Sequence, residues 1–238
     1  MAHLDSYLAG ENFSDDFIYR PKIIGHKAPR SDLLVAWAKG RKVLHVGFAD
    51  HAPLIRQRVA DGSWLHKRLN AAALVCHGVD VSIEAVAVAQ QLGFVNTELL
   101  DIFEHDAPSK LAALDVELVL VPDVLEHLTA PAMFLKRLLL CLPTAEFVIS
   151  VPNGISLRNS IQAIQGIERI NTDHRVWFTP YTVQKTLCDG GLRVSELHSC
   201  PVSPGGSVGG RLLRRFTYRL PLLADCLVLR ATAASGCG

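Results

Sequence analysis

From residue 42 onward, short runs of β-branched and aliphatic residues alternate with longer segments whose apolar residues recur every three or four positions. The short runs predict buried strands, and the longer segments predict amphipathic helices. This alternation is typical of a parallel sheet with helices on both faces, because parallel strands need a crossover connection. We therefore expect a doubly wound α/β fold with seven strands, at 42–46, 73–79, 97–101, 116–121, 146–151, 192–199 and 225–232.

The segments between these runs carry signals for the start and the end of helices. Residues 82–93 begin with Ser82 and end on Gly93, residues 130–142 have a proline in the first turn, and residues 179–191 run from a threonine to two glycines. Serine and threonine cap helix N-termini, and glycine often ends a helix. We expect helices there.

The composition fits one domain with appended segments. Hydrophobic residues make up 49% of the 238 residues, which is enough for one sizeable core. We expect residues 41–238 to form this domain and residues 1–40, with helical material at 31–40, to form a helical lid or side layer. A basic insertion at about 203–224 carries Arg211, Arg214, Arg215 and Arg219 at helical spacing. A solvated helix face and contact with an anionic substrate or membrane surface are both open for it.

Charge and hydropathy narrow the range of partners. The 24 Lys and Arg balance 23 Asp and Glu, so we expect no nucleic-acid partner. The apolar runs are shorter than the roughly 20 residues that cross a bilayer, which predicts no stable membrane insertion. The first residues lack a secretion signal, and the six cysteines form no CxxC pair, so we expect a cytoplasmic protein with reduced thiols. Because the sequence has no CxxC motif and no dense carboxylate cluster, we expect no required metal, and Asp123, Glu126 and His127 are the one set of residues at which a metal stays open. Whether the protein forms a homodimer is left open by the sequence.

Polar or small residues follow the first three predicted strands. Gly47 follows the first strand, where the carboxyl ends of a doubly wound sheet form the ligand crevice. Asp80 ends the second strand and can accept hydrogen bonds from a ribose diol, although capping the next helix is its alternative role. Asp101 ends the third strand and can receive an adenine amine or turn the chain.

The fourth predicted strand runs directly into a polar segment. Glu126 and His127 lie just beyond it, and helix amphipathicity does not account for both. Histidine serves as a general base near neutral pH, but a single histidine is more often packed or hydrogen-bonded. A role in catalysis and a structural role are both open for these residues.

Taken in order, these segments resemble the class I S-adenosylmethionine-dependent methyltransferases. The resemblance covers about residues 40–200 and rests on the strings KVLHVGFADH, GVDVSIEAV, LLDI, LDVELVLVPDVLEHL, FVISVPN and DHRVWFTPYTVQKTLCDGGLRV. It implies a Rossmann-like seven-stranded sheet whose last strand is antiparallel and inserted between the fifth and sixth. It also implies S-adenosylmethionine as the cofactor.

The resemblance assigns cofactor contacts to the strand ends. Gly47 would lie against the methionine part, Asp80 with Val81 would bind the ribose, and Asp101 with Ile102 would frame the adenine. The backbone of Val121, Pro122 and Asp123 would face the amino end of the cofactor. The loop departs from the family pattern, since the usual acidic residue is His45 and two usual glycines are Ala49 and His51. Asp50 is the candidate replacement for the missing carboxylate.

The acceptor end is assigned by the same resemblance. His174 and His127 are the candidate bases, with a slight preference for His174, and Glu126 and Asn153 would orient the acceptor. Arg175 follows His174 in the loop that would contact the acceptor. Trp177 or Phe178 could pack on the apolar part of the acceptor, but a core role is favoured for both.

Three functions are consistent with these residues. The first is methyl transfer to a small-molecule acceptor, most simply O-methylation of a sugar or secondary metabolite. The second is a catalytically silent methyltransferase-like binding or scaffold protein, which the altered loop suggests. An NAD-dependent oxidoreductase is disfavoured because Ala49 and Ala52 stand where the later glycines of GxGxxG would be.

Overall fold

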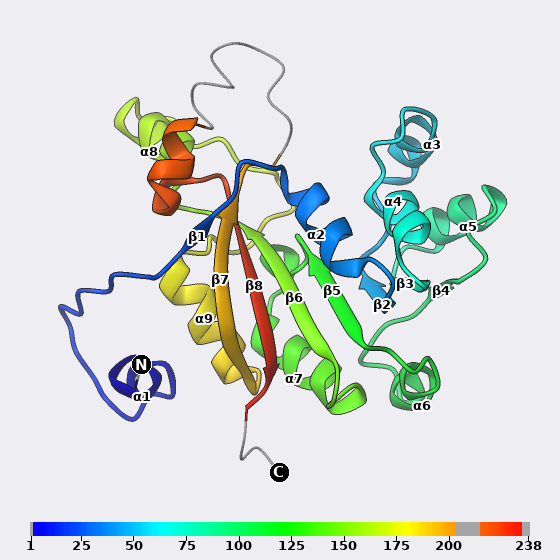
Figure 1. The fold of residues 1–238 in the computed structure, drawn as a ribbon, viewed down its shortest axis with the longest axis horizontal. Helices are drawn as coiled ribbons and strands as arrows, with labels where there is room; N and C mark the ends of the chain where they lie inside the picture. The colour runs from blue at the N-terminus through cyan, green and yellow to red at the C-terminus, as the bar shows by residue number, and fades with distance from the viewer. Residues whose placement is uncertain (1, 203–214, 235–238) are drawn as a thin grey trace.

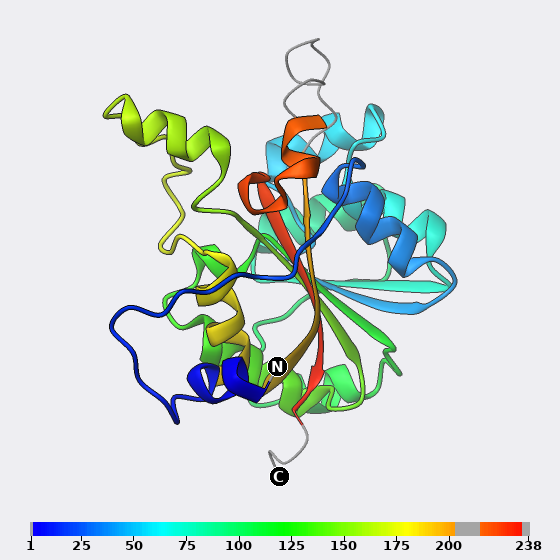
Figure 2. The ribbon, with the colours of Figure 1, turned by 60° about the vertical axis from the view of Figure 1, so that its left-hand side comes forward.

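The computed structural model describes residues 2–202 and 215–234, which form one mixed sheet between two layers of helices (Figures 1 and 2). The sheet order is β1-β7-β8-β6-β5-β2-β3-β4. The strands are β1 Ile24–Gly25, β2 Lys42–Val46, β3 Val75–Asp80, β4 Thr97–Leu99, β5 Leu118–Pro122, β6 Glu146–Pro152, β7 Leu192–Cys200 and β8 Cys226–Ala233.

The prediction of seven strands was wrong, because the sheet has eight. The additional strand is β1, whose residues Ile24 and Gly25 pair in parallel with His198 and Ser199 of β7. Two residues are too few for a periodic pattern, and the pairing depends on the exposed edge of a distant strand. Strand β8 is antiparallel to both β6 and β7 and lies between them, as the resemblance implies.

The helices occupy both faces of the sheet (Figure 2). They are α1 Ala2–Leu8, α2 Arg30–Ala38, α3 Ala52–Ala60, α4 Leu65–Ala72, α5 Ile83–Gln91, α6 Ala107–Ala112, α7 Pro131–Cys141, α8 Leu157–Ile164 and α9 Pro180–Asp189, with short 3-10 turns η1 Leu125–His127 and η2 Pro221–Leu223. The predicted caps are present, since the Ser82 side chain accepts from Ala85 N–H and Thr179 forms a capping box with Thr182. Among the helices of the described residues, none has the length and apolar character needed to cross a bilayer.

Strand β5 shows why the sequences of the central strands are apolar at nearly every position. Leu118 and Leu120 pack on the side of α2 and α4, while Val119 and Val121 pack on the side of α7 and α9. All four side chains are fully buried. Successive side chains of a strand point to opposite faces, and both faces of this strand are covered.

The first 40 residues contribute one helix to each of the two helical layers, α1 on one face of the sheet and α2 on the other. Helix α1 packs against α9, where Lys185 Nζ donates to the Leu8 carbonyl (2.5 Å) and Gln184 Nε2 donates to Tyr19 Oη (2.7 Å). Helix α2 packs against α4 on the other face. The predicted basic insertion at 203–224 lies mostly outside the described residues, which resume at 215 with a helical turn over 215–219.

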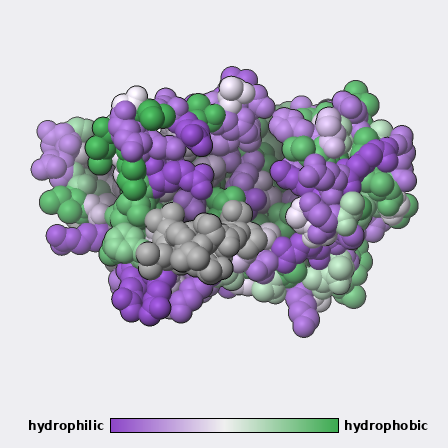
Figure 3. Space-filling model, turned by 90° about the horizontal axis from the view of Figure 1, so that it is seen from above, coloured by the Kyte–Doolittle hydropathy of each residue, from purple (hydrophilic) through white to green (hydrophobic). Residues whose placement is uncertain are grey.

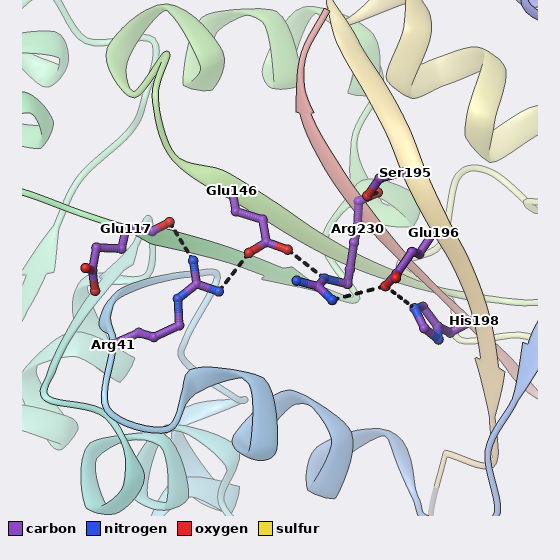
Figure 4. Close-up of polar contacts among 7 residues, drawn as sticks. All are labelled: Arg41, Glu117, Glu146, Ser195, Glu196, His198 and Arg230. Carbon is purple, nitrogen blue, oxygen red and sulfur yellow. Dashed lines mark hydrogen bonds and ion pairs between the residues drawn. The ribbon is translucent and has the colours of Figure 1, made fainter.

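A chain of charged side chains crosses the sheet beside α2 (Figure 4). Glu146 accepts from Arg41 Nη1 (2.7 Å) and from Arg230 Nε (2.6 Å), and Arg230 also donates to Glu196 (3.1 Å). Glu196 is bonded in turn to His198 (3.0 Å). These groups are partly buried, so their mutual pairing offsets the loss of hydration and ties β6, β8 and β7 to the start of β2.

Candidate functional site

The parallel strands all end at one edge of the sheet, which is the upper edge in Figure 1. Figure 3 looks onto this edge, where the surface is hollowed near its middle and hydrophilic residues predominate around the hollow. The sequence-predicted site residues lie near or after the carboxyl ends of β2, β3, β4, β5 and β6 at this edge. The topology therefore brings them to one side of the molecule, as expected for a doubly wound sheet.

The turn after β2 is built on Gly47. Its φ is +67°, in the left-handed region that favours glycine, and its N–H donates to the Val79 carbonyl of β3 (2.9 Å). A Cβ added here would lie 2.5 Å from Val124 Cγ2. The missing side chain thus allows the loop after β2 to approach the turn after β5.

Asp80 holds the same loop in place from β3. Its Oδ2 accepts from Ala49 N–H (3.0 Å) and its Oδ1 accepts from Ser82 N–H (2.9 Å). Each carboxylate oxygen can accept a further hydrogen bond. Val81, the next residue, is 68% exposed, so an uncovered apolar side chain lies directly beside this carboxylate.

The residues after β4 lie at the same edge. Asp101 is exposed, and its Oδ1 accepts from Phe103 N–H (3.0 Å) in a local turn. Ile102 is buried in the main core cluster at 3% exposure. The assignment of both residues to an adenine pocket stays a prediction.

His45 is buried on the opposite side of β2 from the main core cluster. One ring nitrogen lies 3.2 Å from Nδ1 of His66 on α4, and desolvation, with smaller effects of His66 and Arg30, lowers the pKa of His45 well below its usual value. Burial lowers the pKa of His66 to about 3. Both rings are therefore neutral at pH 7, and His45 does not replace the negative charge of the usual acidic residue.

Asp50 and Asp123, the two acidic residues predicted near the amino end of the cofactor through a side chain and a backbone contact, are both paired with arginine. Asp50 accepts from Arg58 of α3 (2.5 Å). Asp123 forms an ion pair with Arg30 of α2, accepts from Ser150 Oγ (3.0 Å) and has a positive φ of +52°. The edge thus presents a cation and an anion side by side between α2 and β5.

Glu126, His127 and His174 form a compact cluster beyond β5. One ligand atom from each lies within 4.8 Å of those of the others, and the two imidazole rings meet edge to face with centroids 4.8 Å apart. Burial raises the pKa of Glu126 to about 7, and desolvation is also the main reason that the pKa of His174 is lowered. The structure therefore brings together the three residues proposed as catalytic.

Arg175 fixes this cluster through its backbone and its side chain. Its N–H donates to the Glu126 carbonyl (2.7 Å), and its Nε donates to the His127 carbonyl (3.0 Å). Asn153 lies in a different setting, since its buried amide donates to the carbonyls of Leu222 and Ala224, at 2.8 Å each. Both amide protons of Asn153 are used within the protein, and its contact with an acceptor stays a prediction.

A cavity of about 540 Å³ opens between α8 and the chain that returns to α9. Trp177 lines it and lies against His174, with ring centroids 6.0 Å apart, while Trp177 Nε1 donates to Glu168 (2.9 Å). Phe178 is a buried core residue. The cavity is also lined by Ile155, Gln162, Ile167 and Arg169, which gives it mixed polar and apolar walls.

Sequence reasoning missed two residues of this region. Arg30 starts a helix within the segment expected to be a side layer, and only the fold shows that it reaches Asp123. His66 was also missed, because its position against His45 depends on how α4 packs on β2. Neither residue belongs to a recognisable motif.

Comparison with known proteins identifies the architecture. No family model and no curated protein matches the sequence. Among solved structures, the chain is similar to magnesium protoporphyrin IX methyltransferase ChlM from Synechocystis PCC 6803 with bound SAH, at 18% identity and a TM-score of 0.50, over 86% of this chain and 82% of that chain. It is also similar to the small RNA methyltransferase HEN1, at 19% identity and a TM-score of 0.56, over 92% of this chain and 27% of that chain. The chain has the class I methyltransferase fold.

This fold alone does not decide the reaction. The [4+2]-cyclase SpnF is similar as well, at 15% identity and a TM-score of 0.54, over 99% of this chain and 93% of that chain. Proteins described as methyltransferases and as a cyclase therefore share this fold, and function has to be argued from the site.

Proposed function

We propose that the protein transfers a methyl group from S-adenosylmethionine to an oxygen of a small-molecule acceptor, such as a sugar or secondary metabolite. The observation that carries this proposal is the pairing of two features at one sheet edge. One is the Gly47 turn held by Asp80, and the other is the cluster of buried Glu126 with half-buried His127 and His174. The first suits a nucleoside, and the second suits a hydroxyl that must lose a proton.

The residues at the edge fit the cofactor. The Asp80 oxygens retain lone pairs for the ribose hydroxyls, and the exposed Val81 offers an apolar surface to the adenine. The ion pair of Arg30 and Asp123 presents opposite charges, which complement the carboxylate and ammonium of an amino acid. This pair would hold the methionine end in place of the missing acidic residue on β2.

S-Adenosylmethionine would supply an electrophilic methyl group on a sulfonium sulfur, so that the oxygen to carbon bond forms as the carbon to sulfur bond breaks and its electron pair stays on sulfur. The chain has to align the acceptor with this bond, which is the main source of rate enhancement in such displacements. The acceptor hydroxyl also loses a proton. If no metal ion is bound there, His174 would accept this proton, since its lowered pKa keeps the ring neutral at pH 7.

The cavity beside His174 would hold the body of the acceptor. Trp177 offers an apolar ring next to the cluster, and Arg169 and Glu168 provide polar walls. A volume of about 540 Å³ suits a small molecule. The acceptor would thus lie between the cluster and α8.

Titration calorimetry tests the proposal on the purified protein of 238 residues. We expect micromolar binding of S-adenosylmethionine and S-adenosylhomocysteine and no binding of NAD. Preferential binding of NAD would favour an oxidoreductase, and a folded protein that binds neither cofactor would favour the silent scaffold. Binding would be followed by acceptor screening for the mass gain of one methylene, and methylation of a small RNA in place of small molecules would refute the small-molecule acceptor.

A further inference from the structure

The cluster of Glu126, His127 and His174 has a feature that proton transfer alone does not require. Glu126 is 1% exposed, and neither of its carboxylate oxygens has a hydrogen-bond partner within the part of the chain that the structure describes. Buried acceptors without donors are rare in native proteins and costly. Burial raises the pKa of Glu126 and the positive charge of Arg30 counteracts this rise, but the guanidinium of Arg30 is paired with Asp123 and does not donate to Glu126.

The two histidines present their ring nitrogens to the same place. The Nδ1–H of His127 donates to the Asp173 carbonyl (3.3 Å), which leaves Nε2 with a free lone pair. A histidine that binds a metal commonly donates its other ring N–H to a backbone carbonyl in this way. His174 Nδ1 is buried and has no partner among the described residues.

The donor set is two imidazole nitrogens and one carboxylate oxygen. Such a set suits first-row divalent ions such as Zn²⁺, Co²⁺, Fe²⁺ and Mn²⁺ and leaves positions open for water or substrate, whereas Mg²⁺ and Ca²⁺ prefer oxygen ligands. The three ligand atoms lie within 4.8 Å of one another. A four-coordinate ion with bonds of about 2.1 Å would hold its ligands about 3.4 Å apart, so modest side-chain rotation closes the site.

The backbone already clamps the two segments that carry these ligands. Glu126 and His127 belong to η1, and His174 lies in the loop before α9. Arg175 joins them through the bonds to the Glu126 and His127 carbonyls. The separation of the segments is therefore fixed by groups other than the ligands themselves.

We propose that Glu126, His127 and His174 bind a divalent first-row transition cation whose open positions face the acceptor cavity at Trp177 and receive an acceptor hydroxyl. The cation site does not depend on methyl transfer, whereas its role in presenting the hydroxyl rests on the proposed function. This assignment departs from the sequence-based expectation that no metal is required.

A bound cation changes the task of the cluster. An imidazole nitrogen that ligates a cation cannot accept a proton there, so the histidines would act as ligands in place of a base. The cation would lower the pKa of the coordinated hydroxyl, whose proton would leave to water while the oxygen attacks the methyl carbon. Glu126 would supply the negative charge that makes the buried site favourable for a cation.

The test starts from the protein of 238 residues, freed of metal by EDTA and dialysis. Co²⁺, Zn²⁺, Mn²⁺ and Mg²⁺ are titrated separately by calorimetry, and the visible absorption of bound Co²⁺ is recorded. We expect one tight site for the transition cations, weaker binding of Mg²⁺ and a Co²⁺ spectrum with nitrogen ligation. Failure of all three transition cations to bind would overturn the proposal.

Variants locate the site. Glu126→Gln keeps the shape of the side chain, and His174→Ala removes a ligand on the other segment, so each should weaken Co²⁺ binding at least tenfold. His105→Ala alters an exposed histidine outside the cluster and should leave the affinity unchanged. If Glu126→Gln fails to fold by circular dichroism, His174→Ala decides. Unchanged Co²⁺ affinity in folded cluster variants would place the cation elsewhere and refute the assignment.

The same metal-free protein is titrated with S-adenosylmethionine, which separates the two proposals. Binding of Co²⁺ without binding of S-adenosylmethionine would refute methyl transfer and leave the cation site standing. Binding of S-adenosylmethionine without binding of any transition cation would refute the cation site and leave the methyl-transfer proposal standing.

Discussion

Arg30 and Asp123 form an ion pair that joins the start of α2 to the turn after β5. The backbone of Arg30 is fixed at the same time, since its N–H donates to the Pro201 carbonyl just after β7 (2.9 Å). Asp123 is held by Ser150 Oγ on β6 (3.0 Å). The pair therefore depends on three separate parts of the sheet, and it lies beside the candidate cofactor site.

We expect Arg30→Met to destabilise the protein by about 1–3 kcal/mol, because it leaves the Asp123 carboxylate partly buried without its cation. A double-mutant cycle with Asp123→Asn, measured by urea unfolding, should give a coupling energy above about 1 kcal/mol. The exposed pair of Lys42 and Asp115 is the control, with coupling of at most about 0.5 kcal/mol. Equal coupling for the two pairs would show that the site pair has no special role.

Gly47→Ala tests the close approach of two turns. We expect a loss of about 2–4 kcal/mol, since a left-handed residue costs roughly 1–2 kcal/mol and the new Cβ would clash with Val124. Gly62→Ala is a matched control, because Gly62 has a φ of +76° and nothing within 4 Å of an added Cβ. Thermal unfolding should show that adding Val124→Ala to Gly47→Ala recovers part of the loss. No recovery would mean that the clash is relieved in another way.

Asp80→Ala should weaken S-adenosylmethionine binding more than tenfold, because a hydrogen bond to a charged group contributes roughly 1.5–3 kcal/mol. It also frees the N–H groups of Ala49 and Ser82, which loosens the loop after β2. Calorimetry measures the affinity, and circular dichroism checks the fold. Asp61→Ala is the control, since Asp61 makes a similar contact to Ser63 N–H (2.8 Å) at the far end of α3. An unchanged affinity of Asp80→Ala for S-adenosylmethionine would refute the prediction that Asp80 binds the ribose.

The buried pair of His45 and His66 predicts a loss of stability in mild acid. An unfolded histidine has a pKa of about 6.5. Burial lowers that of His66 to about 3 in the folded state. Between these values the unfolded chain binds a proton that the native state excludes, so the free energy of unfolding falls with falling pH, by about 2 kcal/mol at pH 5 from His66.

Urea unfolding between pH 7.5 and pH 5 measures this effect. His66→Gln should flatten the pH dependence even if it lowers stability at every pH, because the titrating ring is gone. His105→Gln changes an exposed histidine and should leave the slope as it is. If the free energy of unfolding of His66→Gln depends on pH as steeply as that of the wild type, groups other than His66 cause the acid sensitivity.

The parts of the fold that the sequence predicts are those whose signals are local. Strand β2 was predicted with the same bounds, because its run of apolar residues is buried on both faces. The Ser82 and Thr179 caps were predicted because a capping side chain bonds to residues three positions away. Strand β1 was missed, since its two residues join the sheet only through the edge of β7.

The candidate site shows the same division. Glu126 and His127 stand out in the sequence, but only the fold brings His174 to them, because the contact joins two loops after different strands. Arg30 and His66 were missed for a similar reason, since their partners lie on other elements. The proposed contact of Asn153 with an acceptor stays a prediction, and nothing in the sequence indicated that its amide holds the chain that enters β8.

The position of β8 in the sheet has a consequence for a chain that is still being synthesised. Strand β7 touches only β1 and β8 within the sheet, and β8 is made last of the strands. Until residues 226–233 leave the ribosome, β7 and β1 have no hydrogen-bonded link to β6, whereas β2, β3 and β5 can already pair. The nucleoside end of the site can therefore form early, and the surface that receives Arg30 near Pro201 is completed only when synthesis has passed β8.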